Sequence, residues 1–282
     1  MALPPDFDLN EFVQRVLAED LGKGGDVTSN ATIDADACFS AGMNCRQAIV
    51  VAGLEIAAAF FRALDPEVTV ELLVKDGDRA EHGTTIMRLA GKARAMLTAE
   101  RPALNTVQHL SGIATLTRTY VDEIEGTGAV VIDTRKTLPG LRVLEKYAVR
   151  MGDGQNHRMR LDDGLLIKDN HVAVCGGVAE AVRRAKAANT GLQVQVEVDR
   201  LDQIEPALAA GADRLLLDNM DPAKLREAVK MVAGRVPLEA SGGVTLETIR
   251  FLAETGVDFI SLGRITQSAP SVDIGLDYAL SR

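Results

Sequence analysis

The hydrophobic positions in the first part of the chain follow two different spacings. Residues 8–21 and 53–64 place apolar side chains three and four positions apart, which predicts two amphipathic helices. Asp8 is a suitable N-cap for the first helix, and the glycines from Gly22 onward end it. Residues 36–51 and 68–91 hold short extended runs between turn-forming residues, which indicates strands.

Residues 98–124 return to the helical spacing. We expect this helix to begin with Thr98 as its cap, which places Pro102 near the first turn, where a proline is tolerated. The Ser-Gly-Ile run at residues 111–113 is expected to interrupt the helix. We therefore place a domain boundary at about this point.

From residue 129 onward the chain repeats one unit of a short apolar strand, a polar turn and a helix. The predicted strands are residues 129–132, 164–167, 192–198, 214–217, 237–240 and 258–262. Strands that alternate with helices form a parallel sheet, and the chain lacks the G-x-G-x-x-G fingerprint of dinucleotide-binding sheets. This pattern favours a closed or nearly closed α/β barrel.

Composition narrows the class of protein. The chain of 282 residues contains 4% aromatic residues and no Trp, so its core must be aliphatic. A net charge of −9 argues against a nucleic-acid or membrane surface as partner. The N-terminus resembles no signal peptide, and no stretch has the ~20 apolar residues of a membrane span, so we expect a cytoplasmic protein. Cys38, Cys45 and Cys175 follow no metal-ligand spacing and are expected to be reduced thiols.

Positive charge is nevertheless concentrated in residues 133–168, where eight Lys and Arg residues outnumber Asp and Glu. A basic segment in an acidic chain indicates a pocket for a small polyanion. Chemistry in a parallel barrel takes place at the carboxyl ends of the strands. The candidate cations lie at or beside such ends: Arg135, Lys136, His157, Arg158 and Lys168. Each could instead be a solvated surface charge.

Glycine-containing turns follow the last two predicted strands. Ser241, Gly242 and Gly243 follow one strand and Gly263 follows the other, each shortly before a helix. Backbone amides and helix N-termini bind phosphate at these positions of a barrel. The glycines could also serve only as tight turns, but two such loops in succession favour a phosphate site.

Two carboxylates, Glu197 and Asp218, end neighbouring strands and should point into the barrel mouth. They could bind Mg²⁺, act as an acid and a base, or pair with nearby cations. Magnesium is favoured if the ligand carries a pyrophosphate, because Mg²⁺ shares its shell among carboxylates, waters and phosphate oxygens.

Linked blocks of sequence carry a family resemblance that runs nearly end to end. They read EDLGKGGDVTS from Glu19, LTAERPALN and LSGIAT from Leu97 and Leu110, DTRKTLPGLR and EKYAVR from Asp133 and Glu145, NHRMRLDDGLLIKDNH from Asn156, VEVD from Val196, LLLDN from Leu215, ASGGV from Ala240 and SLGRIT from Ser261. With these blocks in this order, the chain resembles the quinolinate phosphoribosyltransferase family, whose activity is also called nicotinate-nucleotide pyrophosphorylase (carboxylating).

The resemblance implies a pentosyltransferase that joins quinolinate to phosphoribosyl pyrophosphate with Mg²⁺ and gives nicotinate mononucleotide, pyrophosphate and CO₂ for NAD synthesis. By position, it implies a quinolinate site of Arg101, Arg135, His157, Arg158 and Lys168. It implies a phosphoribosyl pyrophosphate site of Lys136, Glu197, Asp218, Ser241, Gly242, Gly243 and Gly263. Glu197 and Asp218 would also hold the Mg²⁺, and the implied catalytic residues are Lys136, Lys168, Glu197 and Asp218.

The resemblance also implies an architecture and an assembly. An N-terminal α/β sandwich domain at residues 1–111, joined by residues 271–282, would accompany an incomplete TIM-like barrel at residues 112–270. Members of the family are at least homodimers, and Arg101 of one subunit would complete the quinolinate site of its neighbour.

Two positions depart from the family pattern. Asp153 stands where three glycines in a row are common, and it adds a negative charge near a site for dianions. Pro102 follows Arg101 where a non-proline residue is usual, which would shift the helix that presents Arg101.

Two other classes of function stay open. A barrel isomerase or synthase acting on a phosphorylated sugar would share the phosphate loop at residues 241–243, but it would not need so many cations. A non-catalytic relative that binds a small anion would keep a similar pocket. The intact set of cations and carboxylates counts against the loss of catalysis.

Overall fold

The computed structural model describes residues 7–279, which cluster into two compact units. Unit 1 contains the described residues up to Leu116, residues 143–153 and those from Ser268 onward. Unit 2 contains residues 117–142 and 154–267. The long helix α4 (Ala93–Glu123) contributes residues to both units.

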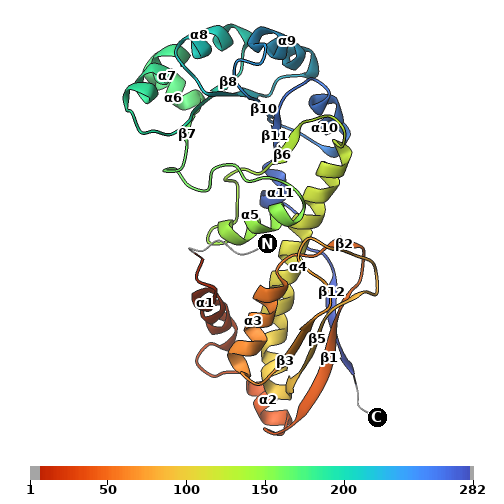
Figure 1. Ribbon diagram of the computed structural model, residues 1–282. Helices are drawn as coiled ribbons and strands as arrows, with labels where there is room; N and C mark the ends of the chain where they lie inside the picture. The colour runs from red at the N-terminus through yellow and green to blue at the C-terminus, as the bar shows by residue number, and fades with distance from the viewer. Residues whose placement is uncertain (1–6, 280–282) are drawn as a thin grey trace. The chain divides into compact units, whose positions relative to one another are not determined.

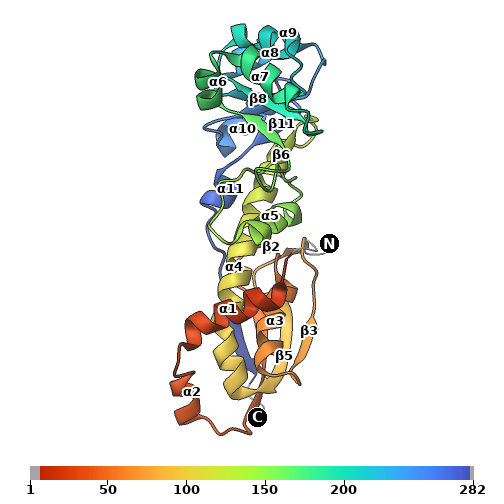
Figure 2. The same ribbon diagram turned by 90° about the vertical axis from the view of Figure 1, so that its left-hand side faces the viewer.

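Unit 1 is built on an antiparallel sheet whose strands lie in the order β12-β1-β5-β3 (Figure 1). Helices α1 and α3 lie on one face of this sheet (Figure 2). The elements of the unit other than α4 are α1 (Leu9–Leu21), α2 (Val27–Thr32), β1 (Cys38–Cys45), β2 (Ile49–Val50), α3 (Leu54–Leu64), β3 (Thr69–Leu72), β4 (Arg79–Ala80), β5 (Thr85–Lys92), most of α5 (Arg142–Met151) and β12 (Ile274–Ala279). The last strand therefore returns to pair with the first.

The two helices predicted early in the chain are confirmed. The Asp8 carboxylate accepts a hydrogen bond from the Glu11 backbone N–H at 2.9 Å, as an N-cap does. The apolar stripe of α1 packs against α3, where the Phe12 and Phe60 rings lie 6.1 Å apart with an edge-on orientation. Burial of these aliphatic and aromatic faces holds the helices to the sheet.

The prediction for residues 98–124 was wrong at two points. Helix α4 begins at Ala93, so Thr98 lies inside it and Pro102 lies well beyond the first turn. The helix also continues through Ser111 and Gly112 without a break. The Thr98 hydroxyl donates to the Arg94 carbonyl within the helix and to Asp26, the N-cap of α2.

Tertiary contacts explain why this helix tolerates residues that usually break helices. The Ser111 hydroxyl is fully buried and accepts a hydrogen bond from the Ala52 backbone N–H at 2.9 Å. A Cβ atom on Gly112 would lie 2.1 Å from the Pro270 carbonyl oxygen, so the glycine permits a close backbone approach. Packing therefore overrides the weak intrinsic preference of these residues.

Unit 2 is built on a parallel sheet in the order β6-β11-β10-β9-β8-β7, with helices along its outer side (Figure 1). All the predicted strands from residue 129 onward are confirmed. The elements are β6 (Val130–Ile132), β7 (Leu165–Ile167), α6 (Asp169–Cys175), α7 (Val178–Ala187), β8 (Val194–Val198), the 3₁₀ helix η1 (Leu201–Gln203), α8 (Ile204–Ala209), β9 (Arg214–Asp218), α9 (Pro222–Val232), β10 (Leu238–Ser241), α10 (Leu246–Ala253), β11 (Phe259–Ser261) and α11 (Arg264–Gln267).

The sheet curves as a barrel does but is not closed, as predicted. Strands β6 and β7 form its two edges, and within residues 7–279 no ladder of hydrogen bonds joins them. An isolated bridge from Ile132 to Gln155 extends the β6 edge. The fold is thus an α/β sandwich-type unit with an incomplete TIM-like barrel.

Two further expectations concern the whole of the described chain. Cys38, Cys45 and Cys175 are free thiols. Across residues 7–279, none of the helices combines the length and the apolar character that a membrane crossing requires.

Candidate active site

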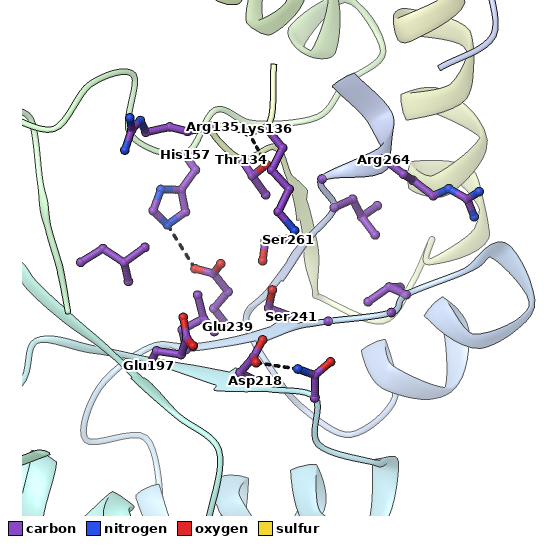
Figure 3. Close-up of a pocket in the computed structure, with 18 of the residues that line it drawn as sticks. Thr134, Arg135, Lys136, His157, Glu197, Asp218, Glu239, Ser241, Ser261 and Arg264 are labelled. Carbon is purple, nitrogen blue, oxygen red and sulfur yellow. Dashed lines mark hydrogen bonds and ion pairs between the residues drawn. The ribbon is translucent and has the colours of Figure 1, made fainter. Parts of the chain in front are cut away.

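The carboxyl ends of the parallel strands in unit 2 surround a cavity of about 890 Å³ (Figure 3). Eleven of the twelve predicted site residues line it: Arg135, Lys136, His157, Arg158, Lys168, Glu197, Asp218, Ser241, Gly242, Gly243 and Gly263. Segments that are far apart in sequence are brought together because parallel strands end at the same edge.

Alternation along each strand determines which residues face this cavity. Paired residues of neighbouring parallel strands point to the same side of the sheet, and the register pairs Asp218 with Ser241. Leu217 and Ala240, which precede Asp218 and Ser241 on their strands, point to the other side and are buried. The inner face of the sheet is therefore polar near its carboxyl edge, while the outer face is aliphatic.

Four cations line the cavity, and we refer to them together as the cationic wall. They are Arg135, Lys136, Arg158 and Lys168. Burial, and then the charge of Arg135, lower the pKa of Arg158. The Arg158 guanidinium also donates to the Gly164 carbonyl at 3.1 Å. The Arg135 and Arg158 guanidinium groups lie close enough for their charges to interact, and together they attract an anion strongly.

Lys136 connects the cationic wall with the last glycine loop. Its side chain extends toward Ser241 and Ser261 (Figure 3). A Cβ atom on Gly263 would lie 2.8 Å from the Lys136 Cδ, so the glycine leaves the space that the lysine occupies. The Thr266 hydroxyl donates to the Lys136 carbonyl at 2.9 Å and fixes the main chain there.

Two carboxylates, Glu197 and Asp218, lie across the cavity from Arg135 and Lys136 (Figure 3). Burial and then the charge of Asp218 raise the pKa of Glu197. Burial also raises the pKa of Asp218, although Lys168 and Lys136 act in the opposite direction. A bound cation would offset the cost of holding two partly desolvated carboxylates together.

The first glycine loop follows β10. Gly242 and Gly243 adopt φ angles of 98° and 60°, in the region that glycine enters most easily. Thr245 then caps the eight-residue helix α10, whose N-terminal amides face the same end of the sheet. The loop thus offers backbone donors to a phosphate group.

His157 lies on the cationic wall, but its ring points to the floor of the cavity (Figure 3). The Nε2 atom is 3.0 Å from the Gln195 Oε1 atom and 3.4 Å from the Glu239 Oε2 atom. The ring is therefore in contact with buried protein groups.

Arg101 is the one predicted site residue that is not among the residues lining this cavity. It belongs to α4 in unit 1, where its side chain is 69% exposed and lies 3.9 Å from the Glu100 carboxylate. Pro102, beside it, is accommodated within the continuous helix. Asp153 is also outside the cavity lining and adopts a φ of 62°, a conformation that favours glycine.

Sequence reasoning missed several polar residues of the site. Asp133 is fully buried and accepts hydrogen bonds from the Asn156 side chain and the His157 backbone N–H. Gln195 and Glu239 lie two residues before Glu197 and Ser241 on the same strands. The period of two along a strand could have identified both, because each shares a face with a predicted site residue.

Comparisons with known proteins identify the family of the chain. The model of the C-terminal domain of quinolinate phosphoribosyl transferase matches residues 113–277, and that of the N-terminal domain matches residues 26–111. A nicotinate-nucleotide pyrophosphorylase [carboxylating] of Mycobacterium leprae is 44% identical, over 96% of this chain and 98% of its own. A probable nicotinate-nucleotide pyrophosphorylase [carboxylating] of Bacillus subtilis is 43% identical, over 97% and 94%.

A solved structure is also similar over its whole length. The nicotinate-nucleotide pyrophosphorylase from Ehrlichia chaffeensis superposes with a TM-score of 0.93 at 40% identity, and covers 97% of this chain and 100% of its own. The domain models, the relatives over nearly their full length and the shared fold lead to one conclusion. The chain belongs to the quinolinate phosphoribosyltransferase family.

Proposed function

We propose that the protein is a nicotinate-nucleotide diphosphorylase (carboxylating). It transfers the phosphoribosyl group of phosphoribosyl pyrophosphate to quinolinate and gives nicotinate mononucleotide, pyrophosphate and CO₂ in NAD biosynthesis. One observation carries the proposal: a single cavity in which a cationic wall faces two carboxylates and two glycine loops. The relatives that match nearly the whole chain carry the name of this activity.

Quinolinate is a planar ring with two adjacent carboxylates, so its site needs concentrated positive charge and paired donors. We assign the positive charge to Arg135, Arg158 and Lys168, and the quinolinate site also includes His157. Burial, and then repulsion from Arg135, lower the pKa of Arg158. A bound dianion would offset that repulsion, which supports the assignment.

Phosphoribosyl pyrophosphate would occupy the opposite side. The 5-phosphate fits the loop of Ser241, Gly242 and Gly243 together with Gly263, where backbone amides are accessible. Lys136 extends over this side of the cavity and would contact the pyrophosphate (Figure 3). Glu197 and Asp218 would accept hydrogen bonds from the ribose hydroxyls.

The two carboxylates also fit a Mg²⁺ ion. Within residues 7–279, no group of three or more His, Cys, Asp and Glu side chains is arranged as a metal site. Magnesium in proteins that bind phosphate esters commonly uses one or two carboxylates and completes its shell with water and phosphate oxygens. Glu197 and Asp218 would hold the ion, which would neutralise charge on the pyrophosphate.

The reaction requires no protein nucleophile. The pyridine nitrogen forms a bond to C1 of the ribose while the bond from C1 to the pyrophosphate oxygen breaks, and pyrophosphate leaves with the electron pair. The bond from ring C2 to its carboxylate then breaks, its electrons remain at C2 beside the cationic nitrogen, and a proton takes the place of CO₂. The protein contributes by aligning the two substrates and by stabilising the departing charge with Lys136.

The proposal includes a homodimer or a larger homo-oligomer in the cytoplasm. Arg101 would complete the quinolinate site of the neighbouring subunit, which is consistent with its high exposure in α4. Subunit mass in solution and cell fractionation test these two points separately.

The function is tested by mixing the protein with quinolinate, phosphoribosyl pyrophosphate and Mg²⁺ and separating the products. Nicotinate mononucleotide is expected only when all three components are present. A sugar-phosphate isomerase or synthase would consume no quinolinate, and a non-catalytic anion-binding protein would bind it without forming a product. Either result would refute the proposal.

A further inference from the structure

A chain of hydrogen bonds runs from the floor of the cavity to the cationic wall. The Gln195 Nε2 atom donates to the Glu239 Oε2 atom at 2.7 Å. The Gln195 Oε1 atom lies 3.0 Å from the His157 Nε2 atom. The Arg158 backbone N–H then donates to the His157 Nδ1 atom at 2.7 Å.

The two ends of this chain fix the direction of every bond in it. An ionised carboxylate can only accept, so Gln195 must turn its NH₂ group toward Glu239 and its carbonyl toward His157. That carbonyl needs a proton on the His157 Nε2 atom. At the other end a backbone N–H can only donate, so the Nδ1 atom must carry no proton. This arrangement fits a neutral ring, because an imidazolium would place two donors against each other at Arg158; the Glu239 Oε2 atom then lies 3.4 Å from the protonated Nε2 atom.

Burial makes this arrangement costly to disturb. Glu239 is 1% exposed and Gln195 is 6% exposed. Arg214 lies 2.7 Å from Glu239 and balances its charge. Burial opposes ionisation of Glu239, but the hydrogen bonds and opposite charge around it, Arg214 included, outweigh burial and hold its pKa below the ordinary value. Breaking a bond within the chain would leave a buried polar group unsatisfied.

We infer that His157, Gln195 and Glu239 are positioning residues: they hold the main chain at Arg158 so that its guanidinium meets a carboxylate of the substrate. His157 then acts as a neutral link, and it does not add a positive charge to the quinolinate site. This inference depends on the proposed function for the identity of the substrate, but the state of the ring follows from the geometry alone.

A second buried carboxylate supports the same role. Asp133, at the end of β6, accepts a hydrogen bond from the His157 backbone N–H at 2.8 Å. His157 is thus held through its backbone by one strand end and through its ring by the sheet floor. Arg135 follows Asp133 by two residues, so the same contacts set the spacing between the two arginines.

The state of the ring can be measured directly in the unmodified protein. The chain contains four histidines, so ¹⁵N-histidine labelling gives few signals, and the signal lost in His157→Gln identifies the ring. We expect one protonated and one unprotonated nitrogen near neutral pH, with the proton on Nε2. Two protonated nitrogens would overturn the inference. This measurement needs no catalytic activity, so it stands even if no nicotinate mononucleotide is formed.

Substitutions at His157 separate a neutral link from a cation. Gln can supply the donor at the position of Nε2, and Asn can supply the acceptor at the position of Nδ1, whereas Lys supplies only charge. We expect Gln and Asn to keep kcat/KM for quinolinate at least about tenfold above that of the Lys variant. If Lys retained more activity than both amides, His157 would be a charged contact.

Gln195→Leu tests the hydrogen-bond chain from Glu239 to His157 at a residue that does not line the cavity. Leu fills a similar volume but breaks the chain between Glu239 and His157. We expect KM for quinolinate to rise about tenfold while KM for phosphoribosyl pyrophosphate changes less than about twofold. Equal changes in both constants would indicate general damage to the sheet, and unchanged constants would show that the link does not position Arg158. Either result would contradict the inference.

Discussion

The side-chain amide of Asn219 donates a hydrogen bond to the Asp218 Oδ2 atom at 2.6 Å. Asn219 adopts a φ of 54°, which asparagine tolerates better than most residues. Its backbone N–H donates to the Ser241 carbonyl at 2.8 Å. One residue therefore connects a carboxylate proposed to bind ribose and Mg²⁺ with the loop proposed to bind the 5-phosphate.

Gly242→Ala should disrupt this connection. A Cβ atom at residue 242 would lie 2.1 Å from the Asn219 Oδ1 atom, and the φ of 98° would strain any side chain. Asn219 would have to move, which would release Asp218. We expect kcat/KM for phosphoribosyl pyrophosphate to fall at least about tenfold, which corresponds to about 1.4 kcal/mol.

Gly243→Ala is the matched comparison. Its φ is 60°, but a new Cβ atom there would meet nothing within 4 Å. Only the left-handed backbone strain of about 1–2 kcal/mol then applies. Steady-state kinetics and thermal denaturation should show the smaller loss in Gly243→Ala; a larger loss there would contradict the role given to Asn219.

Lys136→Ala and Arg158→Ala should reduce turnover strongly and leave the fold intact. Lys136 is proposed to stabilise the departing pyrophosphate, and the loss of one such contact typically costs about 10²–10³ in kcat. Arg158→Ala should act mainly through quinolinate, because its guanidinium is proposed to hold a carboxylate. Circular dichroism checks the fold, and Lys230→Ala, at an exposed position of α9, is the control. Near-wild-type rates for both variants would refute the assignment.

Glu197→Gln should lower the activity of the protein and raise its melting temperature near neutral pH. Because the pKa of Glu197 is raised in the folded protein, ionisation is less favourable there than in the unfolded chain. The free energy of unfolding therefore falls as the pH rises from the ordinary carboxyl pKa to the higher pKa of Glu197 in the folded protein. The variant should melt at a higher temperature than the wild type near neutral pH, and the advantage should vanish in acid.

Thermal denaturation across pH, in metal-free buffer, measures this difference. The same variant should require more Mg²⁺ for half-maximal turnover than the wild type, whose activity should be lost on chelation and restored by Mg²⁺. A lower melting temperature near neutral pH would contradict the account of Glu197.

The shared site can be tested by mixing two inactive variants. If Arg101 serves the neighbouring subunit, a mixed dimer of Arg101→Ala and Lys136→Ala contains one site with both residues intact. Random exchange of equal amounts in a two-fold dimer should restore about a quarter of wild-type activity. No recovery, with exchange confirmed by mass, would show that Arg101 does not act across subunits.

The sequence predicted the barrel strands and most of the cavity because both depend on short-range patterns. Short apolar or alternating runs mark β6 to β11, and a charged or glycine residue at or just after the end of each run points to the common edge. Glu197, Asp218 and Ser241 were located in this way. Their convergence required no knowledge of long-range contacts beyond the parallel order of the strands.

The errors arose where distant contacts decide the structure. Gly112 looks like a helix breaker until the Pro270 carbonyl is placed against it. The contacts of the His157 ring with Gln195 and Glu239 also come from remote segments. No local spacing indicates either set of contacts.

One cavity is proposed to carry out both phosphoribosyl transfer and decarboxylation. Quinolinate labelled with ¹⁴C in the 2-carboxylate tests this coupling when release of ¹⁴CO₂ is followed together with pyrophosphate. Equal amounts of both are expected, and none of either without phosphoribosyl pyrophosphate. Labelled CO₂ released without phosphoribosyl pyrophosphate, or pyrophosphate formed while the label stays in the product, would contradict the proposed coupling.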